Sequence, residues 1–242
     1  MQETKGSALK SMAQYICVAL LLVFGVGIIV SKVATAGTQI EAPTQASRAN
    51  VFKILSINNP KSGGTGFLVN VPNYGKFIVT NRHVCEIDNL ETKYLIVANE
   101  ESGTIYTARR RSISNLTDLC IVYAPSEVLG SLDGLELADR EARPNELTLV
   151  MGHPYLKPLT VYSGHLVNTI VQPYDLNEDP PTKFMRMGRL SFMVFPGNSG
   201  SPVLNADGKV TGVVFAMEGW TRNGLYIPLL DLKYFIISGG SL

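Results

Sequence analysis

After residue 50 the chain consists of short, mainly apolar runs that are separated by turn residues. Aromatic and β-branched residues, which fit a pleated, half-buried surface and which strands prefer, dominate these runs. Asn, Pro and Gly clusters at 58–60, 72–75 and 207–208 mark turns between them. The pattern predicts strands at 51–57, 66–71, 76–80, 94–98, 104–109, 119–123, 147–151, 159–170, 184–194, 202–204, 209–216 and 224–227.

This number of short strands is typical of an all-β sandwich or barrel. The turn-rich stretch 125–144 divides the strands into two halves, at about 50–125 and 138–230. Only 229–238 (LLDLKYFIIS) has a helical pattern, so we expect one short C-terminal helix.

The N-terminal part is a separate segment. Between Lys10 and Lys32 lie 21 uncharged residues, most of them apolar. As a helix this stretch would rise about 31 Å, close to the thickness of the bilayer hydrocarbon. Lys5 and Lys10 precede it, which predicts a cytoplasmic N-terminus and export of the rest of the chain.

The same segment also fits a cleaved signal peptide, with the small residues 34–36 (ATA) as the cleavage site. Lys32 between the apolar run and that site argues against cleavage. We therefore predict a signal anchor or signal peptide at 1–36 and a small, polar linker at 37–49. Residues 50–242 are then extracytoplasmic, either anchored to a membrane or secreted.

Composition excludes some partners. Hydrophobic residues make up 45% of the chain, charged residues 17%, and the net charge is +1, so we expect a globular protein that does not bind nucleic acid. The one basic run, 109–111, is interpreted as part of a solvated strand or loop.

Three cysteines are too few for a disulfide framework. Cys17 lies in the apolar segment, and Cys85 and Cys120 form either a disulfide or two buried thiols.

Three histidines limit the search for catalytic groups. His83 follows a strand-like run that ends in a turn. His153 lies between Gly and Pro and is interpreted as structural, and His165 is expected on the solvent side of a strand. Asp118 has mainly apolar neighbours, and a buried carboxylate is costly unless it is paired. A protonated His83 would be a suitable partner.

The stretch 195–203 (FPGNSGSPV) could present a reactive serine. Glycines on both sides of Ser199 allow a tight turn that exposes its hydroxyl, while the amides of Gly197 and Ser199 point the same way. Convergent amides are what a developing oxyanion needs. An ordinary loop of Gly, Asn, Ser and Pro is the alternative.

Three motifs occur in the order His, Asp, Ser: 80–85 (TNRHVC), 117–122 (TDLCIV) and 197–202 (GNSGSP). Together they resemble the trypsin-like (chymotrypsin-fold) serine proteases, and 64–69 (GTGFLV) is similar to the strand that precedes the histidine in that family. The serine motif is most similar to the bacterial branch that contains glutamyl endopeptidases. Residues 151–154 and 161–164 also resemble stretches of the high-temperature-requirement proteases.

The resemblance implies two six-stranded antiparallel β-barrels, at about 50–125 and 138–230, that meet at the active site. Ser199 would be the nucleophile, His83 the general base, and Asp118 the group that orients the imidazole. The amides of Gly197 and Ser199 would form the oxyanion hole. Substrates would be proteins or peptides, and no metal or organic cofactor is implied.

The resemblance also locates a specificity pocket. Its floor would lie at Met193 and Val194, and its walls at 214–217 and 224–226; the side chains concerned are Val214, Phe215, Ala216, Met217 and Tyr226. Because no charged group is at the floor, we expect a preference for apolar residues before the cleaved bond.

One departure from the family pattern concerns activation. Asn198 replaces the aspartate that in many trypsin-like enzymes pairs with a newly released α-amine, so no activating cut is expected. A catalytically impaired protein that uses the same fold for binding, or a structural β-barrel protein, is the alternative to a protease.

Overall fold

The computed structural model describes residues 43–88, 94–114, 116–173 and 184–239. The predicted membrane segment, the alternative cleavage site and residues 37–42 of the predicted linker lie outside these ranges. None of the helices in the described part of the chain has the length and apolar character that a bilayer crossing requires.

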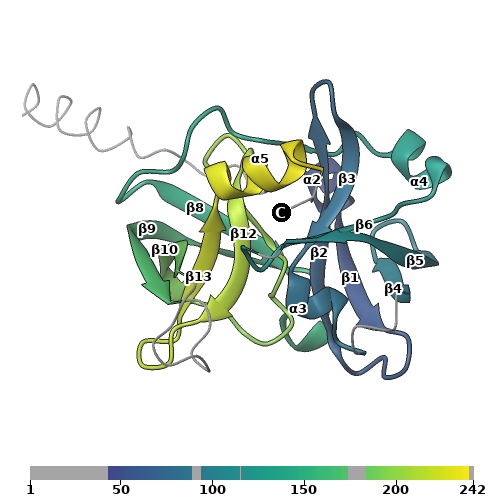
Figure 1. The fold of residues 1–242 in the computed structure, drawn as a ribbon, viewed down its shortest axis with the longest axis horizontal. Helices are drawn as coiled ribbons and strands as arrows, with labels where there is room; N and C mark the ends of the chain where they lie inside the picture. The colour runs from purple at the N-terminus through teal and green to yellow at the C-terminus, as the bar shows by residue number, and fades with distance from the viewer. Residues whose placement is uncertain (1–42, 89–93, 115, 174–183, 240–242) are drawn as a thin grey trace, which may run out of the picture. The chain divides into compact units, whose positions relative to one another are not determined.

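The first half of the chain forms a closed barrel (Figure 1). Its six strands follow the order β1-β4-β5-β6-β3-β2, and antiparallel pairing of β1 with β2 closes the ring. The strands are β1 (Val51–Ser56), β2 (Gly63–Val71), β3 (Gly75–Thr80), β4 (Tyr94–Asn99), β5 (Thr104–Ile113) and β6 (Cys120–Val122). A two-residue strand, β7 (Leu135–Glu136), adds to β2 in parallel.

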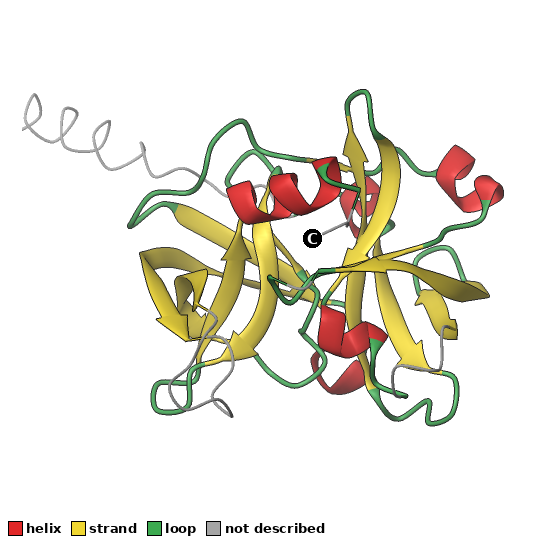
Figure 2. Ribbon diagram, viewed as in Figure 1, coloured by secondary structure: helices red, strands yellow, loops and turns green. Residues whose placement is uncertain are grey.

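The second half forms another closed barrel of six antiparallel strands in the order β10-β13-β12-β11-β8-β9 (Figure 2). The strands are β8 (Leu147–Gly152), β9 (Thr160–Pro173), β10 (Phe184–Met193), β11 (Pro202–Leu204), β12 (Val210–Met217) and β13 (Asn223–Pro228). The prediction of two six-stranded barrels is thereby confirmed, and the predicted strands agree with the observed ones to within a few residues.

Each barrel is closed around its own apolar core, because alternate residues of each strand point inward. The first core consists mainly of Phe52, Ile54, Leu68, Ile78, Val84, Leu95 and Val97. The second consists of Val150, Leu166, Leu190, Val194, Val203, Val214 and Tyr226.

The expectation of a single helix is wrong. The predicted C-terminal helix is present as α5 (Leu229–Ile237), which packs on β12 and β13. Three short α-helices accompany it among the described residues: α2 (Gln45–Arg48), α3 (Arg82–Cys85) and α4 (Ser126–Ser131). Pro154–Leu156 form a single 3-10 turn, η1. Helices of four to six residues leave too few turns for a helical period to appear in the sequence.

The segment between the barrels contacts both of them. β7 pairs with β2 of the first barrel, and two residues later the amide of Ala138 donates to the carbonyl of Val210 in the second, at 2.9 Å. Leu137 also forms an isolated bridge with Val210. The sequence predicts only a turn-rich stretch that separates the two halves, whereas the structure shows a joint that is bonded to both barrels.

Candidate active site

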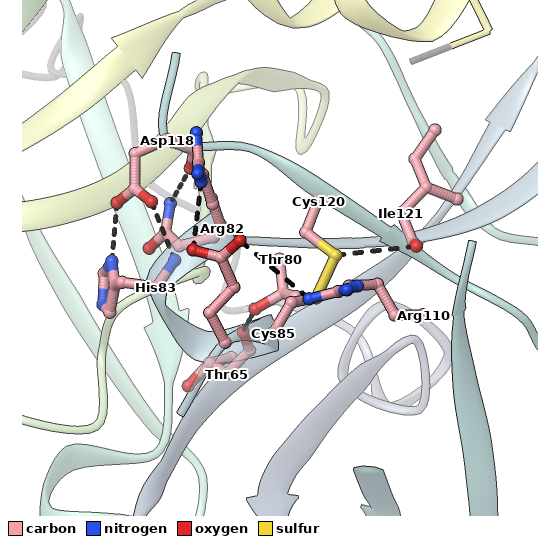
Figure 3. The surroundings of a disulfide bond; sticks show 11 residues. Thr65, Thr80, Arg82, His83, Cys85, Arg110, Asp118, Cys120 and Ile121 are labelled. Carbon is pink, nitrogen blue, oxygen red and sulfur yellow. Dashed lines mark hydrogen bonds and ion pairs between the residues drawn. A yellow bond between two sulfur atoms is a disulfide. The ribbon is translucent and has the colours of Figure 1, made fainter. Parts of the chain in front are cut away.

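His83 and Asp118 form a close pair in the first barrel (Figure 3). His83 lies in α3, directly after β3, and Asp118 lies two residues before β6. The Nδ1 atom of His83 is 2.6 Å from Oδ2 of Asp118, and the backbone N–H of His83 donates to Oδ1 at 2.9 Å. Asn81 donates its side-chain amide to the backbone carbonyl of Asp118 at 2.8 Å. Both carboxylate oxygens are therefore engaged by the same histidine.

This arrangement defines the roles of the two imidazole nitrogens. The side chain of Asp118 is 5% exposed, whereas that of His83 is 50% exposed. An ionised carboxylate only accepts hydrogen bonds, so the proton of the neutral imidazole resides on Nδ1. Nε2 of His83 is then the acceptor nitrogen, which is the state that a general base requires.

The loop that carries Ser199 lies against the same region. The amide of Thr65 in β2 donates to the carbonyl of Ser199 at 2.7 Å. Gly64 lies between Ser199 and Val84 and has no room for a side chain. A Cβ atom there would lie 2.7 Å from the Ser199 carbonyl oxygen and 2.7 Å from Cγ2 of Val84. Ser199 and the residue that follows His83 are therefore neighbours across Gly64.

Some backbone amides of the serine loop donate hydrogen bonds within the protein and others do not. Those of Asn198, Gly200 and Ser201 donate to backbone carbonyls at 2.9, 2.8 and 3.0 Å. Among the described residues, the amides of Gly197 and Ser199 have no acceptor. Gly197 and Gly200 have φ angles of +93° and +86°, in the left-handed region that favours glycine. The two amides that the sequence assigned to an oxyanion hole are thus the two that remain available.

A short turn in the second barrel fixes the peptide before Gly197. The amide of Tyr155 donates to the carbonyl of Pro196 at 2.5 Å, and Tyr155 and Leu156 adopt left-handed φ angles of 53° and 57°. In a trans peptide the C=O and N–H point in opposite directions. With the Pro196 carbonyl held by this turn, the N–H of Gly197 points away from the turn.

The residues predicted for the specificity pocket do not share one environment. Val194, Val214 and Tyr226 are buried in the core of the second barrel, where burial raises the pKa of the Tyr226 phenol. Phe215 and Ala216 are half-buried. Met193 and Met217 are 46% and 42% exposed, and they pair with neighbouring residues of β13, Asn223 and Gly224.

The two other histidines lie where the sequence suggests. His165 is exposed on β9. His153 is 1% exposed, and its Nδ1 atom is 3.1 Å from the carbonyl oxygen of Lys157. Burial lowers the pKa of His153 from 6.5 to about 4.

We expect His153 to make folding sensitive to acid. Between pH 6.5 and about 4 the unfolded chain binds a proton on this residue and the folded chain does not. The free energy of unfolding should therefore fall as the pH falls through this range, by about 3 kcal/mol in total. Urea unfolding at pH 7 and pH 4.5 would measure the loss, and His153→Asn should show less of it. An equal loss in both proteins would contradict the prediction.

A disulfide joins the two segments that carry His83 and Asp118 (Figure 3). Cys85 and Cys120 are bonded, which decides between the two alternatives that the sequence left open. Each cysteine is two residues after one member of the pair, and both are at most 1% exposed. The bond therefore joins α3 to β6 close in sequence to both members of the pair.

Removing this bond should destabilise the fold. The disulfide closes a loop of 35 residues, and a loop of that length corresponds to about 3–4 kcal/mol of stability. We expect a variant with Ala at both positions to unfold at correspondingly lower urea concentration. Reduction of the wild-type protein under mild denaturation should give the same shift. Unchanged stability of the double variant would contradict the prediction.

Two contributors to the site were not found from the sequence. Thr65, which binds the serine loop, is a single threonine in a strand and has no local pattern that marks it. Tyr155 lies in a turn whose sequence draws attention only to its neighbour His153. The Gly-Thr-Gly stretch resembled the family pattern, but its glycines rather than its threonine carried that resemblance.

Comparisons with known proteins identify the family of this chain. A family profile described as the trypsin-like peptidase domain matches residues 64–213. The probable periplasmic serine endoprotease DegP-like of Chlamydia muridarum is 29% identical over 182 residues, which cover 72% of this chain and 33% of the relative. Serine protease Do-like HtrA of Bacillus subtilis is 25% identical over 202 residues, covering 81% and 43%. This chain thus spans about a third to two fifths of the length of these relatives.

Solved structures show the same fold. The serine endoprotease from Yersinia pestis superimposes with a TM-score of 0.63 at 22% identity, covering 83% of this chain and 68% of that one. The active form of the Rv3671c protease from M. tuberculosis gives a TM-score of 0.64 at 22% identity, covering 81% and 83%. Since the family profile covers more than half of the sequence, the chain belongs to the trypsin-like peptidase family.

Proposed function

We propose that this protein is a serine endopeptidase that uses Ser199, His83 and Asp118 as a catalytic triad. The observation that supports this most directly is that Asp118 accepts two hydrogen bonds from His83, one from Nδ1 at 2.6 Å and one from the backbone N–H at 2.9 Å. A carboxylate in that position keeps the imidazole in the tautomer that can accept a proton at Nε2.

The proposed reaction has two stages. In the first, Ser199 Oγ attacks the carbonyl carbon of the substrate while Nε2 of His83 takes the hydroxyl proton, and His83 then protonates the leaving amine. In the second, water attacks the acyl-enzyme, gives a proton to His83, and the Ser199 hydroxyl is restored. Asp118 stays ionised throughout and stabilises the imidazolium.

The amides of Gly197 and Ser199 would bind the oxyanion that forms in each stage. Their lack of acceptors among the described residues supports this role, since a preorganised donor need not break another bond before it acts. Asn198 is fully buried and neutral, so it cannot form an ion pair with a new α-amine. The uncut chain should therefore already be active.

Substrates in this proposal are proteins or peptides with an apolar residue before the cleaved bond. Met193 and Met217 are the predicted pocket residues that are exposed enough to contact it. We expect a peptide library to show enrichment of apolar residues at that position, and Met217→Lys to reduce the enrichment. Strict selection of Glu or Arg by the wild-type protein would refute this preference.

The location is proposed from the sequence and the relatives together. The relative from Chlamydia muridarum is named a probable periplasmic endoprotease, and the apolar stretch before Lys32 fits an exported chain. We propose that residues 50–242 form one protease domain outside the cytoplasm, joined to the membrane by 1–36 or secreted after cleavage.

A fluorophosphonate probe tests the proposed activity, because it labels only an activated serine. The wild-type protein should be labelled and should cleave fluorescein-labelled casein. Ser199→Ala should lose the label and the cleavage, while Ser201→Ala, two residues away, should retain both. Absence of labelling in the folded wild-type protein would overturn the proposal.

A further inference from the structure

We propose that the Thr65 hydroxyl is a positioning group that holds the oxyanion loop in its active conformation. This inference rests on the proposed function and adds a residue from outside the triad and the oxyanion hole. Thr65 lies in β2 of the first barrel and is fully buried.

The Thr65 hydroxyl bridges three parts of the molecule. Its Oγ1 atom donates to the carbonyl of Gly197 at 2.7 Å and accepts from the amide of His153 at 3.0 Å. One strand of the first barrel, one turn of the second barrel and the serine loop therefore meet at a single oxygen. The donor and one acceptor position of the hydroxyl are both used.

The backbone of Thr65 holds the same loop at a second point. Its amide donates to the carbonyl of Ser199 at 2.7 Å, and its carbonyl accepts from Oγ1 of Thr80 at 2.6 Å (Figure 3). Thr80 precedes the turn into the helix of His83. Thr65 is thus fixed from the side of the general base and in turn fixes the loop of the nucleophile.

Gly197 is the residue that most needs such a restraint. Glycine has access to more backbone conformations than any other residue, and the direction of its N–H depends on the peptides on both sides. Tyr155 holds the peptide before Gly197 through the carbonyl of Pro196. Thr65 holds the peptide after it through the carbonyl of Gly197. Only with both bonds present is the N–H of Gly197 directed to one place.

Thr65→Val tests the role, because it keeps the shape of the side chain and removes the hydroxyl. We expect kcat for labelled casein to fall about 10- to 100-fold, part of the 10²–10³ that one lost oxyanion donor costs. KM should change less than about twofold, because the oxyanion hole acts mainly in the transition state. The rate of fluorophosphonate labelling should fall with kcat.

Two variants separate positioning from stability. Thr65→Ser keeps the hydroxyl and should restore kcat to within about threefold of wild type, on the expectation that one hydroxyl bond sets the loop. Thr211→Val removes another buried hydroxyl, which donates to the carbonyl of Val203 at 3.2 Å within the second barrel. It should lose stability without loss of kcat. If Thr65→Val does not fold, Thr65→Ala provides the same comparison.

Hydrogen exchange gives a readout that does not depend on catalysis. Amide exchange in a peptide covering 195–201 should become faster in Thr65→Val and stay unchanged in Thr211→Val. If the fluorophosphonate probe does not label the wild-type protein, the proposed function is refuted. The exchange measurement would still test whether Thr65 holds the serine loop. Wild-type kcat in Thr65→Val, failure of Thr65→Ser to rescue, or unchanged exchange would each overturn the inference.

Discussion

Asp118→Asn is expected to lower kcat about 10⁴-fold with little change in the fold, as loss of the triad carboxylate does in such enzymes. Oδ1 of Asp118 accepts from the backbone N–H of His83 while Oδ2 faces Nδ1. An asparagine can keep the first bond only by placing its NH₂ group against Nδ1. The imidazole must then carry its proton on Nε2, the atom that has to accept the proton of Ser199.

The opposite orientation of the side-chain amide in Asp118→Asn is also unfavourable, because its NH₂ group would then face the backbone N–H of His83, and two donors cannot form a hydrogen bond. Steady-state cleavage of labelled casein and the labelling rate with a fluorophosphonate would measure the loss. Asp133→Asn changes an exposed carboxylate in the segment between the barrels and should be neutral. A loss of less than about tenfold in Asp118→Asn would contradict the assigned role.

Gly197→Ala should lower kcat about 10²–10³-fold, the effect of losing one oxyanion donor. The residue has a φ of +93°, and a Cβ atom would lie 2.3 Å from the carbonyl oxygen of His153 and 2.9 Å from the amide nitrogen of Tyr155. These are backbone atoms, which cannot give way as the end of a flexible side chain can, so we expect the 196–197 peptide to rotate instead. Its N–H then leaves the place where the oxyanion forms.

Gly208→Ala is a matched control for this variant. Gly208 also has a left-handed φ, +74°, but open space surrounds the position of its Cβ atom. Both variants carry the cost of a left-handed alanine, and only Gly197→Ala should lose kcat. Equal activity in the two variants, with normal unfolding, would show that the Gly197 amide does not contribute to catalysis.

The strands and the order of the catalytic motifs could be predicted from the sequence. The short runs of β-branched and aromatic residues that form β1 to β6 and β8 to β13 are a local signal, and Asp118 stands out because its neighbours are mainly apolar. The His, Asp and Ser motifs each lie within a few residues, so they could be identified before their positions in space were known.

Other parts depend on contacts between distant residues and left no local signal. Thr65 reaches Gly197 only after the two barrels meet, and a single threonine in a strand has many other uses. β7 has two residues, too few for a period. Val214 and Tyr226 match the pocket positions of the family, yet their side chains are in the barrel core. A position in an alignment does not give the direction of a side chain.

The joint between the barrels also limits how this chain can be divided. β7 completes a sheet on one side, while Leu137 and Ala138 are bonded to Val210 on the other. A cut on either side of the joint deprives one half of a strand or an edge partner. We therefore expect either half, expressed alone, to be less stable than the intact pair of barrels.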